Sequence, residues 1–282
     1  MEEIILKSVI PKHYVPELQG RDDFDVKYED NLPCPKCNRN GGQAIFYRIH
    51  GQKEWIQVGE TQICYQCEEE EMFPYLEEVR KKEEKLRAER LMQKYFLIPE
   101  TLKNAGFKNY EVLDSATAKA KEDAMQYVKD FLDGNYYSLL FMGSPGTGKS
   151  HLCAAIARTV KEHGYSVGFI TTGEVLRKIK NTYGPGALES EETIFNDLKR
   201  LDLLILDDLG SESTGGNDDW RLAMLFEMVN SRMGKPTVYT TNFDDVRLPD
   251  AVGARVSSRL NENTKFIDLF RAEDYRKRLR VG

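Results

Sequence analysis

The chain has 282 residues, 40% of them hydrophobic, and a formal net charge of −6 from 46 acidic and 40 basic residues. This length suits one large domain or two modest ones with a buried core. The negative net charge argues against a protein that coats nucleic acid generally, but it does not exclude a local basic strip that binds it. No apolar run is long enough to span a membrane, and residues 1–12 do not resemble a secretory signal. We therefore expect a cytoplasmic protein with no membrane partner.

Four of the five cysteines form two pairs, Cys34-x-x-Cys37 and Cys64-x-x-Cys67. In a cytoplasmic chain such pairs indicate a metal rather than disulfides. Two knuckles of this kind complete a tetrahedral Cys₄ zinc site, and four thiolates leave no open position on the Zn²⁺. Short strands are expected at 44–47 and 55–58, so we predict a zinc ribbon with a structural metal.

The sequence does not decide whether this ribbon binds nucleic acid or another protein. An acidic flank at 68–71 would repel DNA, and we favour docking onto a protein. The side chains that could instead contact nucleic acid are Lys36, Arg39, Tyr47, Arg48, Lys53 and Trp55. Residues 75–95 follow and are rich in Glu, Lys and Arg at i,i+4 spacing, which predicts an exposed helix.

Residues 143–150 read Gly-Ser-Pro-Gly-Thr-Gly-Lys-Ser, a complete G-x-x-x-x-G-K-[ST] phosphate-binding loop. The apolar run 137–142 predicts a strand before it, and the apolar spacing over 151–161 predicts a helix after it. Glycines let backbone N–H groups turn toward the phosphates, while Lys149 neutralises charge and Ser150 can bind Mg²⁺. The expected nucleotide-binding residues are Gly143, Ser144, Pro145, Gly146, Thr147, Gly148, Lys149, Ser150 and His151.

The apolar run 203–206 ends in Asp207 and Asp208, as a buried strand beside a phosphate loop does. Asp207 would hold Mg²⁺ and Asp208 would polarise the attacking water. A further strand, 237–241, ends at Asn242, whose amide either orients that water or simply forms a turn. Glycines predict loops at 184–196 and 215–217.

Arg255 and Arg259 are four residues apart and so share one helix face. Such arginines either reach the γ-phosphate bound by a neighbouring subunit or form a solvated basic face, and spacing alone does not decide between them.

Taken together, five stretches resemble the DnaC/DnaI-type bacterial helicase loaders and their IstB-like relatives, in the initiator clade of AAA+ ATPases. They are LLFMGSPGTGKSHLCAAIA, LLILDDLGSE, TTNF, ARVSSRL and EDYRKR. The likeness covers about residues 99–282, and the cysteine-bearing region is most like the DnaI type. It implies an α/β fold with a central parallel sheet and no C-terminal lid domain, plus a small N-terminal zinc ribbon.

The resemblance also implies roles for single residues. ATP would be the nucleotide, with Asp207 and Asp208 as Walker B and Asn242 as sensor I. The implied arginine finger is Arg259 with Arg255 beside it, and Arg276 is a weaker match to a late sensor arginine. Many AAA+ proteins carry Glu where this chain has Asp208, so hydrolysis is expected to be slow and stimulated by DNA or oligomerisation.

The function implied is ATP-dependent loading of the replicative hexameric DNA helicase onto single-stranded DNA during replication initiation. Residues 1–74 would dock on the helicase, 75–98 would form a charged helical linker, and 99–282 would form the ATPase. Subunits would associate head to tail in a ring or spiral. Candidate DNA contacts are Arg177, Lys178 and Lys180, which are equally well explained as a solvated helix face.

Two alternatives stay open: an IstB-like transposase helper that acts on duplex DNA, and a non-hydrolysing helicase-binding adaptor. Bacterial and phage origin are both open as well, since a compact loader would suit a phage replication module.

Overall fold

In a computed structural model, the protein is described over residues 15–19, 21–212 and 218–275. The chain divides into two compact units, residues 1–84 (unit 1) and 85–282 (unit 2). Within the described ranges, no helix is long and apolar enough to cross a membrane. The cytoplasmic location stays a prediction.

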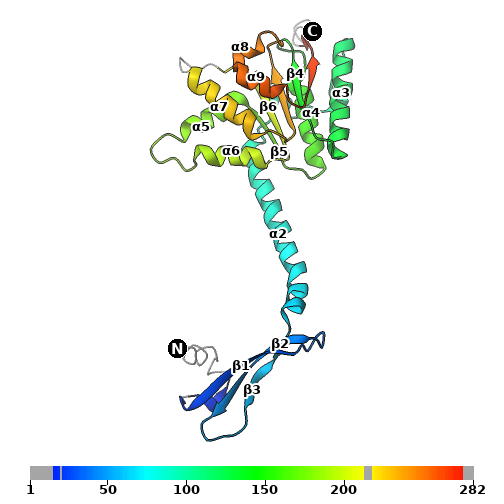
Figure 1. The fold of residues 1–282 in the computed structure, drawn as a ribbon. Coiled ribbons are helices and arrows are strands. Elements are labelled where there is room, and N and C mark those ends of the chain that lie inside the picture. Colours follow the sequence, from blue (N-terminus) through cyan, green and yellow to red (C-terminus); the bar gives the residue numbers. More distant parts are fainter. Residues whose placement is uncertain (1–14, 20, 213–217, 276–282) are drawn as a thin grey trace. The chain divides into compact units, whose positions relative to one another are not determined.

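Unit 1 is built on a three-stranded antiparallel sheet of β1 (Phe24–Pro33), β2 (Asn40–Ile49) and β3 (Ile56–Gln62), in that order (Figure 1). The short 3₁₀ helix η1 (Pro16–Leu18) adds Leu18 to the core beneath the sheet. The strand predicted at 44–47 lies within β2 and the one predicted at 55–58 overlaps the start of β3, whereas β1 was not predicted. The hydroxyl of Tyr47 donates to Glu17, and this side chain is 1% exposed. Its suggested contact with nucleic acid is therefore wrong.

Helix α2 (Tyr65–Tyr95) begins ten residues before the predicted start at 75. Its first turns carry the run of acids from Glu68 to Glu71, and negative charge near a helix N-terminus favours the helix. At its C-terminal end, Leu91 and Tyr95 are buried in the core of unit 2. The ammonium of Lys94 also bonds Asp197 there, at 2.7 Å.

Unit 2 has a five-stranded parallel sheet in the order β5-β6-β7-β4-β8. The strands are β4 (Ser138–Met142), β5 (Val167–Thr171), β6 (Leu203–Leu209), β7 (Thr237–Thr241) and β8 (Thr264–Asp268). Each of the predicted strands in this part of the chain is present. Because all five strands run the same way, residues that follow β4, β6 and β7 meet at one edge of the sheet.

Helices cover both faces of this sheet (Figure 1). The helices α3 (Ser115–Leu132) and α4 (Lys149–Glu162) pack on the face that carries Leu139 and Phe141. The opposite face carries Leu140 and Met142 and is covered by α5 (Thr172–Asn181), α6 (Glu191–Arg200), α7 (Asp218–Ser231), α8 (Leu248–Val252) and α9 (Ala254–Leu260). Two 3₁₀ turns, η2 (Glu100–Leu102) and η3 (Phe107–Asn109), precede α3.

The loop predicted at 184–196 is wrong in its second half, because α6 begins at Glu191. The side chain of Ser190 caps this helix by accepting the N–H of Thr193, and Ile194 and Leu198 are buried. The loop predicted at 215–217 lies outside the described residues. After β8, the described chain continues only to residue 275, and this short stretch holds no lid domain.

Candidate nucleotide site and cysteine cluster

The phosphate loop connects β4 to α4 at the carboxyl edge of the sheet. Gly146 and Gly148 both have φ of 87°, a left-handed conformation that glycine adopts without a side-chain clash. Gly148 is the N-cap residue of α4, so the first N–H groups of this helix face the loop. The hydroxyl of Thr147 donates to Ser144 O at 2.9 Å and closes the turn. This backbone fits the phosphates of a nucleotide.

Lys149 lies at the centre of the site and is buried. Its ammonium donates to Gly143 O at 2.6 Å, to Ser144 O at 3.0 Å and to Asn242 Oδ1 at 2.9 Å. The cation is therefore fixed between the phosphate loop and the residue that follows β7, where it can neutralise phosphate charge.

Asp207, at the carboxyl end of β6, lies beside the start of α4. Its Oδ1 accepts the hydroxyl of Ser150 at 2.9 Å and that of Thr240 at 2.6 Å. Burial raises the pKa of the Asp207 carboxyl, and these two hydrogen bonds oppose the increase. A hydroxyl and a carboxylate within hydrogen-bond distance are hard oxygen ligands that suit Mg²⁺, so these two residues fit the metal expected with ATP.

Asp208 is exposed and has φ of 64°. Its N–H donates to the hydroxyl of Thr240 at 2.9 Å, and its Oδ1 accepts the amide of Asn242 at 3.1 Å. Asn242 thus joins Asp208 to Lys149. The structure brings together the phosphate loop, both acids and this asparagine, although they are far apart in the sequence.

A cavity of about 760 Å³ opens over the loop. One wall is formed by the predicted residues from Pro145 to His151, with Asp208 and Asn242. The other wall was missed by sequence reasoning, because the segment from Pro99 to the first turn of α3 carries no motif. Its lining residues are Thr101, Leu102, Asn109, Tyr110, Glu111, Leu113 and Thr117.

The segment after β8 was also missed as a part of the site. Its backbone is fixed to the loop at two points, by Leu269 N to Met142 O at 2.7 Å and by Tyr275 N to Gly146 O at 3.0 Å. A Cβ at Gly146 would lie 1.9 Å from Oδ1 of Asp274, so this carboxylate is packed against the loop. Arg276, expected as a sensor, lies outside the described residues.

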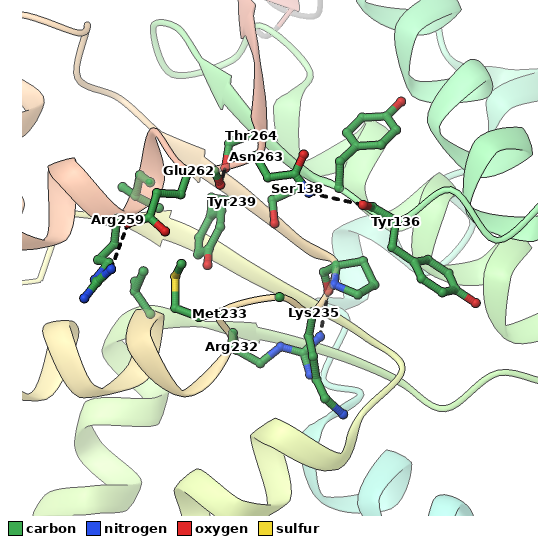
Figure 2. Close-up of a pocket in the computed structure, with 15 residues that line it drawn as sticks. Tyr136, Ser138, Arg232, Met233, Lys235, Tyr239, Arg259, Glu262, Asn263 and Thr264 are labelled. Carbon is green, nitrogen blue, oxygen red and sulfur yellow. Dashed lines mark hydrogen bonds and ion pairs between the residues drawn. The ribbon is translucent and has the colours of Figure 1, made fainter.

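Arg255 and Arg259 are not among the described residues that line the nucleotide cavity. Arg259 instead lines a smaller cavity of about 230 Å³, which is also lined by Ser138 and Thr264 at the amino ends of their strands. Figure 2 shows its guanidinium paired with Glu262, at 2.8 Å. Arg255 lies over the ring of Phe226, 3.9 Å from its centre. Neither arginine therefore lines the nucleotide cavity of its own chain, and their role as an arginine finger stays a prediction.

In unit 1, the four cysteines Cys34, Cys37, Cys64 and Cys67 converge, and their sulfur atoms all lie within 4.8 Å of one another. The N–H of Cys64 donates to Cys34 Sγ at 3.3 Å, and backbone hydrogen bonding of this kind lowers the pKa of the Cys34 thiol to about 6. Four clustered sulfurs fit a tetrahedral zinc ion.

The suggested DNA contacts lie on α5, where Arg177 and Lys180 are exposed. Arg177 pairs with Glu174 at 3.0 Å, and the ammonium of Lys178 lies 5.8 Å from the centre of the Tyr95 ring. Their contact with DNA stays a prediction.

The parallel sheet, the phosphate loop and the acids and asparagine beside it define a P-loop ATPase of the AAA+ type. Residues 59–249 match the family of IstB-like ATP binding proteins, and the chain belongs to this family. The replicative helicase loader DnaC of Escherichia coli K12 is 33% identical over 178 residues, which cover 62% of this chain and 71% of that protein. DnaC of Buchnera aphidicola from Schizaphis graminum is 27% identical over 185 residues, covering 65% and 74%.

Solved structures show the same fold. A crystal structure of the DnaC helicase loader superimposes with a TM-score of 0.54 at 24% identity, over 61% of this chain and 99% of that one. A crystal structure of DnaI gives a TM-score of 0.53 at 24% identity, over 61% and 95%.

Proposed function

We propose that this protein uses ATP to load the replicative hexameric DNA helicase onto single-stranded DNA during replication initiation. The observation that carries the proposal is the 33% identity to the replicative helicase loader DnaC. The geometry of Lys149, Asp207 and Asn242 supports an ATPase that turns over.

In the proposed reaction, the phosphate loop and Lys149 bind the β- and γ-phosphates of ATP. Ser150 and Asp207 would hold Mg²⁺, and this ion would neutralise charge that develops on the phosphates. Asp208 and Asn242 orient the attacking water. Turnover is slow and is stimulated by DNA or by association of subunits, because no arginine of residues 15–19, 21–212 and 218–275 lines the nucleotide cavity of its own chain.

Head-to-tail association would bring Arg259 of one subunit to the nucleotide of the next. The test is complementation between two inactive variants. Arg259→Ala keeps the ATP pocket, and Lys149→Ala keeps the arginine. We expect each to lose DNA-stimulated hydrolysis alone and the mixture to recover part of it. Arg255→Ala, in the same mixing experiment, shows which arginine acts. A mixture as inactive as its parts would refute action between subunits.

The zinc-bearing unit would dock on the helicase. A pull-down of the replicative helicase from the source organism compares the full chain with residues 85–282, the second compact unit. We expect binding by the full chain alone, and ATP affinity that is equal for both proteins. Equal capture of helicase by the two proteins would refute docking through unit 1.

The DNA strand is proposed to bind at α5. Replacing Arg177, Lys178 and Lys180 by Ala should weaken binding of single-stranded DNA and reduce its salt dependence, with ATP affinity unchanged. A matched control replaces the exposed Lys119 on α3. An IstB-like transposase helper would instead prefer and bend duplex DNA, and a non-hydrolysing adaptor would show no hydrolysis that depends on Lys149.

A further inference from the structure

Tyr110 lies between η3 and α3 and lines the nucleotide cavity. Its side chain is 6% exposed, and its hydroxyl has no hydrogen-bond partner among the described residues. A buried hydroxyl without a partner costs free energy, and native proteins rarely leave one in place without a reason. In a binding cavity, one reason is that the ligand supplies the partner.

The Tyr110 ring is packed against the last glycine of the phosphate loop. A Cβ at Gly148 would lie 2.8 Å from Cε2 of Tyr110 and 3.0 Å from its hydroxyl oxygen. Gly148 is also the N-cap of α4. The hydroxyl is therefore close to the helix N-terminus, which is where backbone N–H groups receive phosphate.

His151 also contacts the Tyr110 ring. The two rings meet edge to face, with centres 5.3 Å apart and an angle of 72°. The imidazole Nε2 is in turn 3.1 Å from Gly106 O. Tyr110 is thus held in place by α4 and by the loop before η3, so little side-chain entropy would be lost when a ligand binds.

The position along the cavity indicates which part of the nucleotide the hydroxyl meets. Asp208 and Asn242 line the end of the cavity where the γ-phosphate is expected. Thr101 and Leu102 line a part of the cavity that is formed by the segment before α3. Tyr110 belongs to the cavity wall formed by the segment before α3, but it also contacts the phosphate loop. It therefore lies where the phosphate chain of the nucleotide joins the nucleoside. Burial raises the pKa of its hydroxyl to about 12, so the group is a donor at neutral pH.

We propose that Tyr110 is a binding residue of the ATP site whose hydroxyl donates a hydrogen bond to the phosphate nearest the nucleoside. This proposal rests on ATP binding at the phosphate loop. It assigns the orphan hydroxyl to the ligand and predicts that ATP and ADP, which share this phosphate, depend on it equally.

The test is Tyr110→Phe in the full chain, with two measurements. Affinity for ATP, ADP and 2′-deoxy-ATP is measured by calorimetry, and stability without nucleotide by urea denaturation. We expect all three nucleotides to bind about tenfold more weakly, as for loss of one hydrogen bond to a charged group. Stability without nucleotide should stay equal or rise, because the unpartnered hydroxyl is gone. A residue with a purely structural role would not give this opposite pair of changes.

Tyr127→Phe is the matched control, because its hydroxyl is also buried and lacks a partner among the described residues. Tyr127 belongs to α3, packs in the core and is not among the described residues that line the nucleotide cavity. This variant should leave all affinities unchanged. Wild-type affinity of Tyr110→Phe for ATP and ADP would overturn the proposal. A loss for ATP without one for 2′-deoxy-ATP would move the hydrogen bond to the ribose and overturn the phosphate assignment. Unchanged nucleotide binding by Lys149→Ala would show instead that the ATP site itself is misplaced.

Discussion

Arg232, at the C-terminal end of α7, is expected to be one of the largest single contributors to the stability of unit 2. Its side chain is 2% exposed. The guanidinium donates to Leu198 O at 2.9 Å, to Leu201 O at 2.6 Å and to Pro236 O at 2.6 Å. It therefore connects the end of α6, the end of α7 and the start of β7.

Arg232→Met keeps most of the side-chain volume and removes every donor. Three backbone carbonyls in the interior then lose their partner, at roughly 1 kcal/mol each. The change also removes a buried cation, whose burial lowers the pKa of Arg232 to about 10. This gain offsets part of the loss, since burying a charge is itself costly. We expect a net loss of about 2 kcal/mol, which is large against a typical total of about 5–15 kcal/mol.

Urea denaturation followed by circular dichroism measures the change, and the transition of unit 2 is recognised as the one that ATP shifts. Arg200→Met is the matched control, because Arg200 is exposed at the end of α6. It should cost less than about 0.5 kcal/mol. If Arg232→Met costs less than about 1 kcal/mol, the three carbonyls do not depend on this guanidinium and the reasoning fails.

Three further predictions follow from other parts of the structure. Cys64→Ser should lower bound zinc from about one ion per chain to nearly none by atomic emission, with ATP affinity unchanged; full zinc content would contradict the four-cysteine site. Asp114 caps α3 by accepting the N–H of Thr117 at 2.7 Å, which lowers the pKa of its carboxyl. Asp114→Ala should lower the free energy of unfolding by about 1 kcal/mol at neutral pH. Because the pKa of Asp114 is lower in the folded protein than in the unfolded one, this difference from the wild type should disappear as the pH falls below about 4. A difference in stability that persists in acid would point to another cause. Asp274→Asn removes negative charge packed against Gly146, so ATP should bind roughly threefold more tightly by calorimetry, and weaker binding would refute repulsion.

The parts of the site that follow from local pattern could be predicted from the sequence. The phosphate loop is a contiguous motif. Asp207 follows an apolar run, and Asn242 follows a run of β-branched and aromatic residues, and each run is short enough to be a buried strand. Parallel strands then bring these ends to one edge without further information. The cysteine cluster could also be predicted from local pattern, because each Cys-x-x-Cys pair is brought together by a single turn.

The rest depends on contacts that no local pattern encodes. Tyr110 and Asp274 reach the phosphate loop from segments on either side of the ATPase core, and nothing in their neighbours signals it. Arg232 looks like a solvated charge at a helix end, and only the fold buries it. Strand β1 was missed because its second half alternates poorly, with register shifts between Glu29 and Pro33.

The backbone at Asp208 restricts which acid can follow Asp207. Its φ of 64° lies in the left-handed region, and Gly210, two residues on, has φ of 88°. Aspartate and asparagine tolerate this region better than longer side chains do. A glutamate here would gain reach toward the water but would work against the left-handed backbone at this position. Among related ATPases, we therefore expect the identity of this acid and the backbone conformation at the end of β6 to vary together. Exchanging the side chain alone then does not reproduce the arrangement.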